Sequence, residues 1–284
     1  MLRANLLLLA GLYALGVGPI RARFGLGPPA ERWRLLSFAT GVLLLALVLD
    51  GPIHELSDNY LFSAHMFQHM VLTLFAPPLL IVGIPGWLVG PIARHPRLGP
   101  IVRRIVSPLV AFSVFNLAFV LSHVPAFYQR TLEDHGWHIA EHLLFMFTAI
   151  LTWWPVFSTS ADLPRLGYPL RMLYVFGQTF AGFIVGSFLT NARDVLYPFY
   201  AAAPRVFPIN PLDDQRLGGL LMWVVGNFYL LLLFTGVFLA WISRERVQDE
   251  AVEAPEFSRR RAMLAAQAPG ASVILEDPSD SRRN

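Results

Sequence analysis

The chain has 284 residues, of which 55% are hydrophobic and only 14% are charged. A soluble domain of this size carries about a quarter charged residues, so this composition indicates an integral membrane protein, and the length suits one helical bundle. The sequence contains no cysteine, which excludes disulfides, iron–sulfur clusters and thiolate metal sites. A net charge of +3 is too small to indicate a nucleic-acid partner, and the sequence has no phosphate loop or dinucleotide fingerprint.

Seven apolar runs are long enough to cross a membrane, for which a helix needs about 20 mostly apolar residues. We therefore predict an all-α polytopic membrane protein with seven transmembrane helices. The first run resembles a signal peptide, but the arginine cluster from Arg21 to Arg34 follows it directly and indicates a retained span. The predicted spans are residues 4–20, 33–49, 66–90, 106–121, 139–157, 170–190 and 219–242.

Arginines in the loops predict the orientation of the bundle. The second loop has none, the fourth has only Arg130, and those of the sixth are balanced by aspartates. The positive-inside rule then places the amino terminus outside and the carboxyl terminus in the cytoplasm of a multi-pass protein of the plasma (inner) membrane. Residues 1–243 would form the membrane domain, and the charged residues 244–284 a cytoplasmic tail that is largely disordered. The first, third and fifth loops hold Arg21, Arg23, Arg32, Arg34, Arg94, Arg97, Arg103, Arg104, Arg165 and Arg171.

Two histidine pairs share one spacing on the predicted outer side. His65 and His69 open the third span, and His138 and His142 open the fifth. At i and i+4, the two rings lie on one face of a helix, one turn apart, so one helix can supply two metal ligands. Glu141 lies near the second pair, as a ligand or as a group that orients an imidazole. The alternative is that these histidines are structural residues with hydrogen-bond partners inside the bundle.

Methionines accompany the first pair and indicate which metal would bind. Met66 and Met70 repeat at i and i+4, and Met222 lies in the outer half of the last span. Thioether and imidazole together favour Cu(I) over magnesium or calcium, while zinc has little use for thioether. The alternative is that these methionines only fill space between helices.

Several other residues are expected to be structural. Prolines 77 and 78 predict a bend in the third span, and Trp153 and Trp154 are expected in an interfacial belt. Gln178 and Asn227 are mid-depth polar residues that we expect to bond between helices. His54 and His135 lie in loops and are expected to be solvated; His95 lies on the cytoplasmic side.

At this point the motifs resemble a known family. The stretches "SAHMFQHMVLTLFAPPLL", "LSHVPAFYQRTLEDHGWHIAEHLLF", "LTWWPV" and "DDQRLGGLLMWV" are similar to those of the seven-helix CtaG-type cytochrome c oxidase assembly factors. The resemblance covers about residues 50–241, and its specific parts are the two histidine blocks. It implies a site made of His65, His69, His123, His138 and His142, with Asp214 and Met222 in the last block.

The resemblance implies a non-catalytic assembly factor that supports copper-centre formation in a haem–copper oxidase. The partners would be oxidase subunits, periplasmic or extracytoplasmic copper chaperones, and membrane lipid. A nucleic-acid partner is not expected. The five histidines would bind Cu(I), Met66, Met70 and Met222 would form a relay, and Glu141 and Asp214 would support the ligands. Two alternatives remain: a b-type cytochrome with a bis-histidine haem, and a copper transporter, which needs ligands across the full membrane depth. No catalytic motif occurs, so we do not expect an enzyme.

Overall fold

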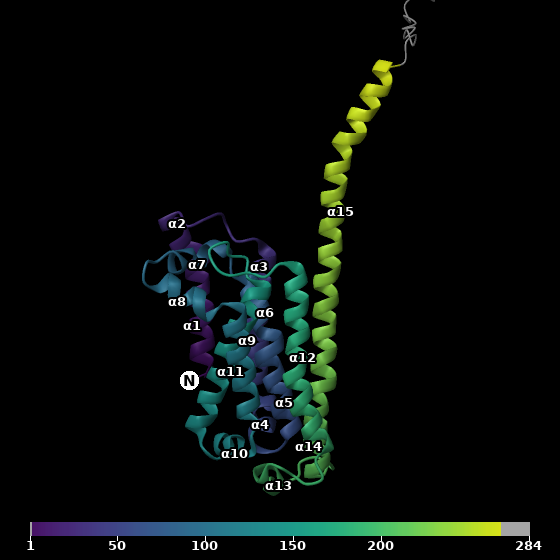
Figure 1. Ribbon diagram of the computed structural model, residues 1–284. Helices are drawn as coiled ribbons and strands as arrows, with labels where there is room; N and C mark the ends of the chain where they lie inside the picture. Colours follow the sequence, from purple (N-terminus) through teal and green to yellow (C-terminus); the bar gives the residue numbers. More distant parts are fainter. Residues whose placement is uncertain (1, 268–284) are drawn as a thin grey trace, which may run out of the picture. The chain divides into compact units, whose positions relative to one another are not determined.

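A computed structural model describes residues 2–267, and every regular element among them is helical, as predicted (Figure 1). Three π-helical turns, Gly16–Ile20, Val71–Phe75 and Leu221–Val225, join helices that follow one another. The helices are α1 (Leu2–Leu15), α2 (Arg21–Phe24), α3 (Arg32–Leu49), α4 (Pro52–Asn59), α5 (Phe62–Met70), α6 (Ala76–Gly83), α7 (Gly86–Ala93), α8 (Leu98–Ile105), α9 (Pro108–Ser122), α10 (Pro125–Glu133), α11 (His135–Phe157), α12 (Tyr168–Asn191), α13 (Pro198–Ala202), α14 (Pro211–Leu220) and α15 (Gly226–Gln267).

Six helical stretches within the described residues are long and apolar enough to cross a membrane, and they match six of the seven predicted spans. The predicted fourth span is instead a bent pair, in which α8 and α9 meet at 60°. Pro108 opens α9, and the residue before a proline avoids the helical conformation; Ser107 accordingly has the extended angles φ −63° and ψ 141°. Together these findings agree with a multi-pass membrane protein. The sides of the membrane on which the termini lie remain a prediction.

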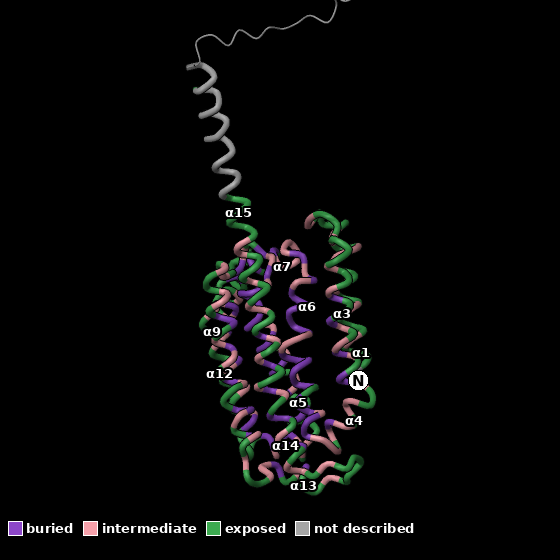
Figure 2. Tube along the Cα trace, turned by 90° about the vertical axis from the view of Figure 1, so that its right-hand side faces the viewer, coloured by how far each residue is buried: buried purple, intermediate pink, exposed green. Residues whose placement is uncertain are grey.

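The third span is the centre of the bundle (Figure 2). In the apolar 18-residue stretch of Phe62–Gly83, 72% of the residues are buried, against 6% in the corresponding stretch of Arg3–Phe24. α6 packs against α3 and α11, and α5 packs against α4 and α14. A substitution in the third span therefore affects contacts with most of the bundle.

Pro77 and Pro78 free two backbone carbonyls in this buried span, because proline has no N–H to donate to the preceding turn. A π-helical turn, Val71–Phe75, lies directly before them. The indole of Trp153 on α11 donates to the Thr73 carbonyl at 2.7 Å, and the hydroxyl of Tyr229 on α15 donates to the Leu74 carbonyl at 2.9 Å. The expectation that Trp153 is interfacial is therefore wrong: it is fully buried, because its N–H replaces a donor that the prolines lack.

Removing one of these replacement donors should lower stability without disturbing the packing. Tyr229→Phe keeps the ring that contacts Phe75 at 4.4 Å between centres but leaves the Leu74 carbonyl unpaired. We expect a loss of about 1 kcal/mol in the free energy of unfolding, the size of a hydrogen bond between membrane helices. Thermal unfolding of the purified protein in detergent measures it, with Tyr168→Phe at the start of α12 as the control. Equal melting temperatures for both variants would contradict the assigned role.

The two ends of the bundle differ in chemistry. α4, α10, α13 and α14 lie together at one end, and α2, α7 and α8 lie at the other (Figure 1). The first end holds seven of the eight histidines, while the opposite end holds His95, whose Nδ1 accepts from the backbone N–H groups of Arg97 and Leu98 at 3.2 Å. The predicted separation of histidines from the arginine-rich loops is thus present in the fold.

From Phe238 onward the chain forms a second unit, described by itself. The helix α15 continues through it to Gln267. Residues 244–267 are rich in Glu, Arg and Ala, which are strong helix formers. The disorder expected for residues 244–284 stays a prediction. The remaining residues, 268–284, lie outside the described part of the chain.

Candidate metal centre

Five imidazoles meet at the end of the bundle that contains α4, α10, α13 and α14. The ring centres of His65 and His69 on α5 are 4.3 Å apart, as are those of His138 and His142 on α11. Between the two helices, His65 lies 5.3 Å from His138 and His69 lies 5.3 Å from His142, ring centre to ring centre. His123, at the end of α9, lies 6.4 Å from His69. The structure therefore brings together all five histidines that the sequence indicates.

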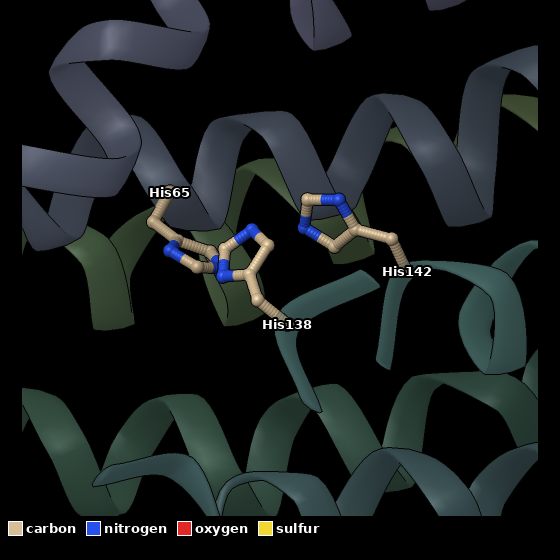
Figure 3. A group of neighbouring side chains, drawn as sticks. All are labelled: His65, His138 and His142. Atoms are coloured by element: carbon tan, nitrogen blue, oxygen red, sulfur yellow. The ribbon is translucent and has the colours of Figure 1, made fainter. Parts of the chain in front are cut away.

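Two overlapping groups of side chains have a spacing that suits a metal ion. Ligand atoms of His65, His138 and His142 lie within 4.8 Å of one another (Figure 3), and so do ligand atoms of His65, His69 and Glu141. A bound ion stays about 2.0–2.2 Å from such atoms, so small side-chain rotations complete either set. Imidazole with or without a carboxylate suits copper and zinc. His65 belongs to both groups and is fully buried.

Two aspartates fix the helices that carry these histidines. Asp134 accepts hydrogen bonds from the backbone N–H groups of Gly136 and Trp137 at 2.8 and 3.1 Å, which caps α11. Asp214 on α14 is fully buried and accepts from the N–H groups of Phe62 and Ser63, at 2.7 and 3.1 Å, and from the Ser63 hydroxyl. A carboxylate at this position is also favoured by the positive end of the α5 dipole. Asp214 therefore anchors the start of α5 and does not bond to an imidazole among the described residues.

A hydrogen-bond chain determines which nitrogen of His65 carries the proton. The Tyr200 hydroxyl donates to the Ser57 carbonyl at 2.7 Å, so it can only accept from His65 Nδ1, 2.8 Å away. The lone pair of a neutral His65 is therefore on Nε2. This nitrogen lies 2.8 Å from His69 Nε2, which must then be the donor. The lone pair of His65 Nε2 therefore points into the cluster, where it accepts from His69, and a metal ion would take the place of that hydrogen bond.

Many buried polar atoms of this cluster have no hydrogen-bond partner within residues 2–267. An unpaired buried polar group costs about 1–3 kcal/mol, and native proteins contain few of them. Their concentration in one place indicates a site built for a ligand. They are the imidazole nitrogens His69 Nδ1, His123 Nε2, His138 Nε2 and His142 Nε2.

Asp58 and His54 form a half-buried rim of the cluster. Asp58 Oδ1 lies 3.3 Å from His54 Nδ1 and 3.6 Å from His138 Nε2. Burial opposes ionisation of Asp58, but the hydrogen bond with His54 and the nearby imidazoles outweigh it and lower the pKa of Asp58 to about 2. The same hydrogen bond raises the pKa of His54. The Asp58 carboxylate is thus negatively charged at neutral pH and lies close to His138. His54, expected to be solvated, has a defined partner here, whereas His135 is exposed.

Two cavities adjoin the histidines. One, of about 50 Å³, is lined by His69, His123 and the three candidate methionines, Met66, Met70 and Met222. The other, of about 530 Å³, lies between α9, α10 and α11, and its mostly apolar wall includes Glu141, Arg130, Thr131 and Ser122. The three methionines are buried. Because they line the same cavity as His69 and His123, they lie close to these imidazoles.

Several polar residues of this region carry no signal in the sequence. Tyr200 orients His65, Tyr197 donates to the His123 carbonyl at 3.0 Å, and the Tyr128 ring stacks on that of His123 at 6.2 Å. Asp58 carries no such signal either. Tyr200 lies on α13, Tyr197 lies directly before it and Tyr128 lies on α10. Nothing in one sequence separates these tyrosines from ordinary interfacial aromatics. They become recognisable only through contacts such as His65–Tyr200, which span 135 residues of chain.

Tyr200 offers a test of the proton placement on His65. Tyr200→Phe preserves the packing of the ring but removes the acceptor of His65 Nδ1. We expect affinity for a probe metal such as Co(II) to fall about 10- to 100-fold, as for other residues that orient a metal-binding histidine. Titration followed by the absorption of bound Co(II) measures the change, with Tyr60→Phe at the end of α4 as the control. An unchanged affinity in Tyr200→Phe would show that the chain does not orient the ligand.

Comparison with known proteins adds the family context. Residues 11–244 match the family described as cytochrome c oxidase caa3 assembly factor (Caa3_CtaG). Uncharacterized proteins of Mycobacterium bovis and Mycobacterium tuberculosis are each 24% identical over 250 residues, which is 82% of this chain and 37% of the relative. An uncharacterized protein of Mycobacterium leprae is 21% identical over 264 residues, covering 86% of this chain and 40% of that protein. The chain thus spans well under half the length of these relatives, and no solved structure matches it.

Proposed function

The chain belongs to the family of cytochrome c oxidase caa3 assembly factors, and we propose that it binds copper as cargo at the five-histidine cluster and supports copper-centre formation in the oxidase. Membership of this family implies that the protein associates with cytochrome c oxidase. The copper site, the direction of transfer and the orientation of the cluster toward the outer face are parts of the proposal.

One observation carries the proposal: three imidazoles with ligand atoms within 4.8 Å of one another, surrounded by buried nitrogens that have no partner among the described residues. Structural histidines would be expected to have their hydrogen bonds satisfied. Here His138 Nε2 and His142 Nε2 are buried and unpaired within that same part of the chain. A cation that accepts electron pairs satisfies them all at once.

The ligand chemistry supports copper. The chain has no cysteine, so an ion must be held by imidazole, carboxylate or thioether. Magnesium and calcium prefer oxygen ligands, and zinc rarely binds thioether, whereas Cu(I) accepts both imidazole and thioether. The cluster offers imidazoles with methionines directly beside them. Cu(I) bound in this way can move between sites by exchanging one ligand at a time, which suits delivery to a partner.

The two alternatives receive less support. A bis-histidine haem needs an open plane between axial rings from two helices, but the facing rings of α5 and α11 are close together, with ring centres 5.3 Å apart for both His65–His138 and His69–His142. A transporter needs a path across the membrane. Gln178 is instead bonded between helices, with its amide donating to Thr152 at 2.7 Å and accepting from Asn116 at 3.0 Å, and the apolar core lies beyond. Nothing in the cluster favours catalysis, so the proposed role is a metallochaperone and not an enzyme.

Copper content of the oxidase tests the proposed function. In a host with a caa3-type oxidase, deletion of the gene should lower the copper-to-haem ratio of the purified oxidase, and the wild-type gene should restore it. The purified assembly factor should contain copper under reducing conditions and show no Soret band. An oxidase with full copper after deletion would contradict the proposal, and a Soret band would favour the haem alternative.

A further inference from the structure

The smaller cavity beside the cluster has chemistry of its own. Its volume is about 50 Å³, and a cavity needs only about 10–15 Å³ to hold a water molecule, so an ion with a residual water fits. Its wall combines two imidazoles with three thioethers, from His69, His123, Met66, Met70 and Met222. His65, His138 and His142, which make the first group of the metal centre, do not line it.

Both imidazoles present bare electron pairs rather than N–H groups. With neutral rings, His65 Nε2 accepts from His69 Nε2, so the lone pair of His69 is on Nδ1. His123 Nδ1 lies 2.6 Å from the Phe119 carbonyl and must donate to it, which leaves the lone pair of His123 on Nε2. Neither His69 Nδ1 nor His123 Nε2 has a hydrogen-bond partner in the described chain, and both are buried.

Two of the three side-chain amides that line the cavity, Asn116 and Gln178, are engaged in hydrogen bonds with other groups. The Asn116 amide donates to the Phe112 carbonyl at 2.8 Å and to Gln178 Oε1 at 3.0 Å, and the Gln178 amide donates to Thr152. Thr73 donates to the His69 carbonyl at 2.7 Å. The thioethers have only lone pairs to offer. The wall thus offers the electron pairs of two imidazoles and three thioethers, and the Asn227 amide is a hydrogen-bond donor that also lines the cavity.

We infer that this cavity is a second metal position, selective for a soft monovalent cation such as Cu(I), with His69 Nδ1, His123 Nε2 and methionine sulfur as its ligands. The ring centres of His69 and His123 are 6.4 Å apart, a separation that an ion about 2.0–2.1 Å from one nitrogen of each ring can span. Sulfur ligands exclude hard cations from the cavity position. The imidazole and carboxylate groups of the five-histidine cluster also accept borderline divalent ions.

His69 links the two positions. Its Nε2 faces His65 in the five-histidine cluster, and its Nδ1 is the unpaired atom assigned to the cavity. An ion that leaves the ligands of the cluster can therefore exchange to the ligands of the cavity through this ring. The inference rests on the proposed function and deepens it, because the cavity position would retain Cu(I) and exclude zinc.

Metal binding to the full-length protein in detergent tests the inference. Ag(I) serves as a redox-inert soft probe and Co(II) as a borderline one. The triple variant Met66→Leu, Met70→Leu, Met222→Leu conserves side-chain volume, an exchange that cores tolerate. We expect the Ag(I) affinity of the cavity position to fall at least about tenfold, while Co(II) binding to the five-histidine cluster is unchanged. Met172→Leu on α12 is the control and should change neither.

X-ray absorption of the Cu(I)-loaded wild-type protein tests the same point without a variant. Because the chain has no cysteine, any sulfur shell around copper must come from methionine. A sulfur shell supports the inference, and a shell of nitrogen and oxygen only would overturn it, as would unchanged Ag(I) binding in the triple variant. Failure of the proposed function looks different: the wild-type protein would then bind neither Ag(I) nor Co(II).

Discussion

Replacing His65 and His69 together with alanine should abolish copper binding by the purified protein. His65 belongs to both candidate ligand groups, and His69 belongs to one of them and also borders the cavity. Loss of a group that only orients a metal ligand lowers affinity about 10- to 100-fold, so loss of two ligands should exceed that range. Copper per protein after purification under reducing conditions should fall to background. In cells, the copper-to-haem ratio of the oxidase should fall to that of the gene deletion.

Two controls separate ligand loss from misfolding. His135→Ala, at the exposed start of α11, and His95→Ala, at the opposite end of the bundle, should retain full copper. The double variant should still elute from size exclusion as the wild-type protein does. A double variant that keeps wild-type copper would remove the basis for the metal site.

Asp214→Ala should cause the largest loss of stability. The carboxylate is fully buried and accepts three hydrogen bonds from the first turn of α5, two of them from backbone N–H groups. Hydrogen bonds to a charged group contribute about 1.5–3 kcal/mol each, and the N–H groups of Phe62 and Ser63 would be left unpaired. We expect the free energy of unfolding to fall by about 3–5 kcal/mol, measured by denaturation in detergent, with weaker binding of Co(II) because α5 carries His65 and His69.

The neighbouring Asp213 provides a matched control for this variant. Its side chain is 54% exposed and pairs with Arg216 at 3.4 Å and with the side chain of Asn210, so Asp213→Ala should change stability by less than about 1 kcal/mol. Asp214→Asn should have an intermediate effect, since its amide oxygen can still accept one of the hydrogen bonds. Equal effects of Asp213→Ala and Asp214→Ala would contradict the anchoring role.

Local patterns in the sequence predict much of this architecture. Hydrophobic runs predict the six long spans, and the i, i+4 spacing of His65 with His69 and of His138 with His142 predicts two rings on one face of each helix. These features depend on helix geometry alone. The arginine-rich loops likewise separate one end of the bundle from the histidine-rich end.

What the sequence does not reveal depends on contacts between distant segments. The roles of Tyr200 and Asp214 follow from partners 135 and 151–152 residues away. Trp153 appears interfacial until the carbonyl of Thr73, freed by two prolines, is found beside it. The bend between α8 and α9 has a local signal, Pro108, but the hydrophobic run conceals it. For Tyr200, Asp214 and Trp153, a hydrogen-bonding requirement of one helix is met by a residue of another.

The anchoring of α5 by Asp214 has a consequence for biosynthesis. The ribosome delivers all five clustered histidines by residue 142, yet the acid that fixes the start of α5 follows some 70 residues later, in the last span. Until α14 has entered the membrane, the first N–H groups of α5 lack their acceptor, and Tyr200 also has yet to emerge. A nascent or truncated chain ending before Asp214 should therefore contain every candidate nitrogen ligand without being ready for copper, so that loading awaits completion of the polypeptide.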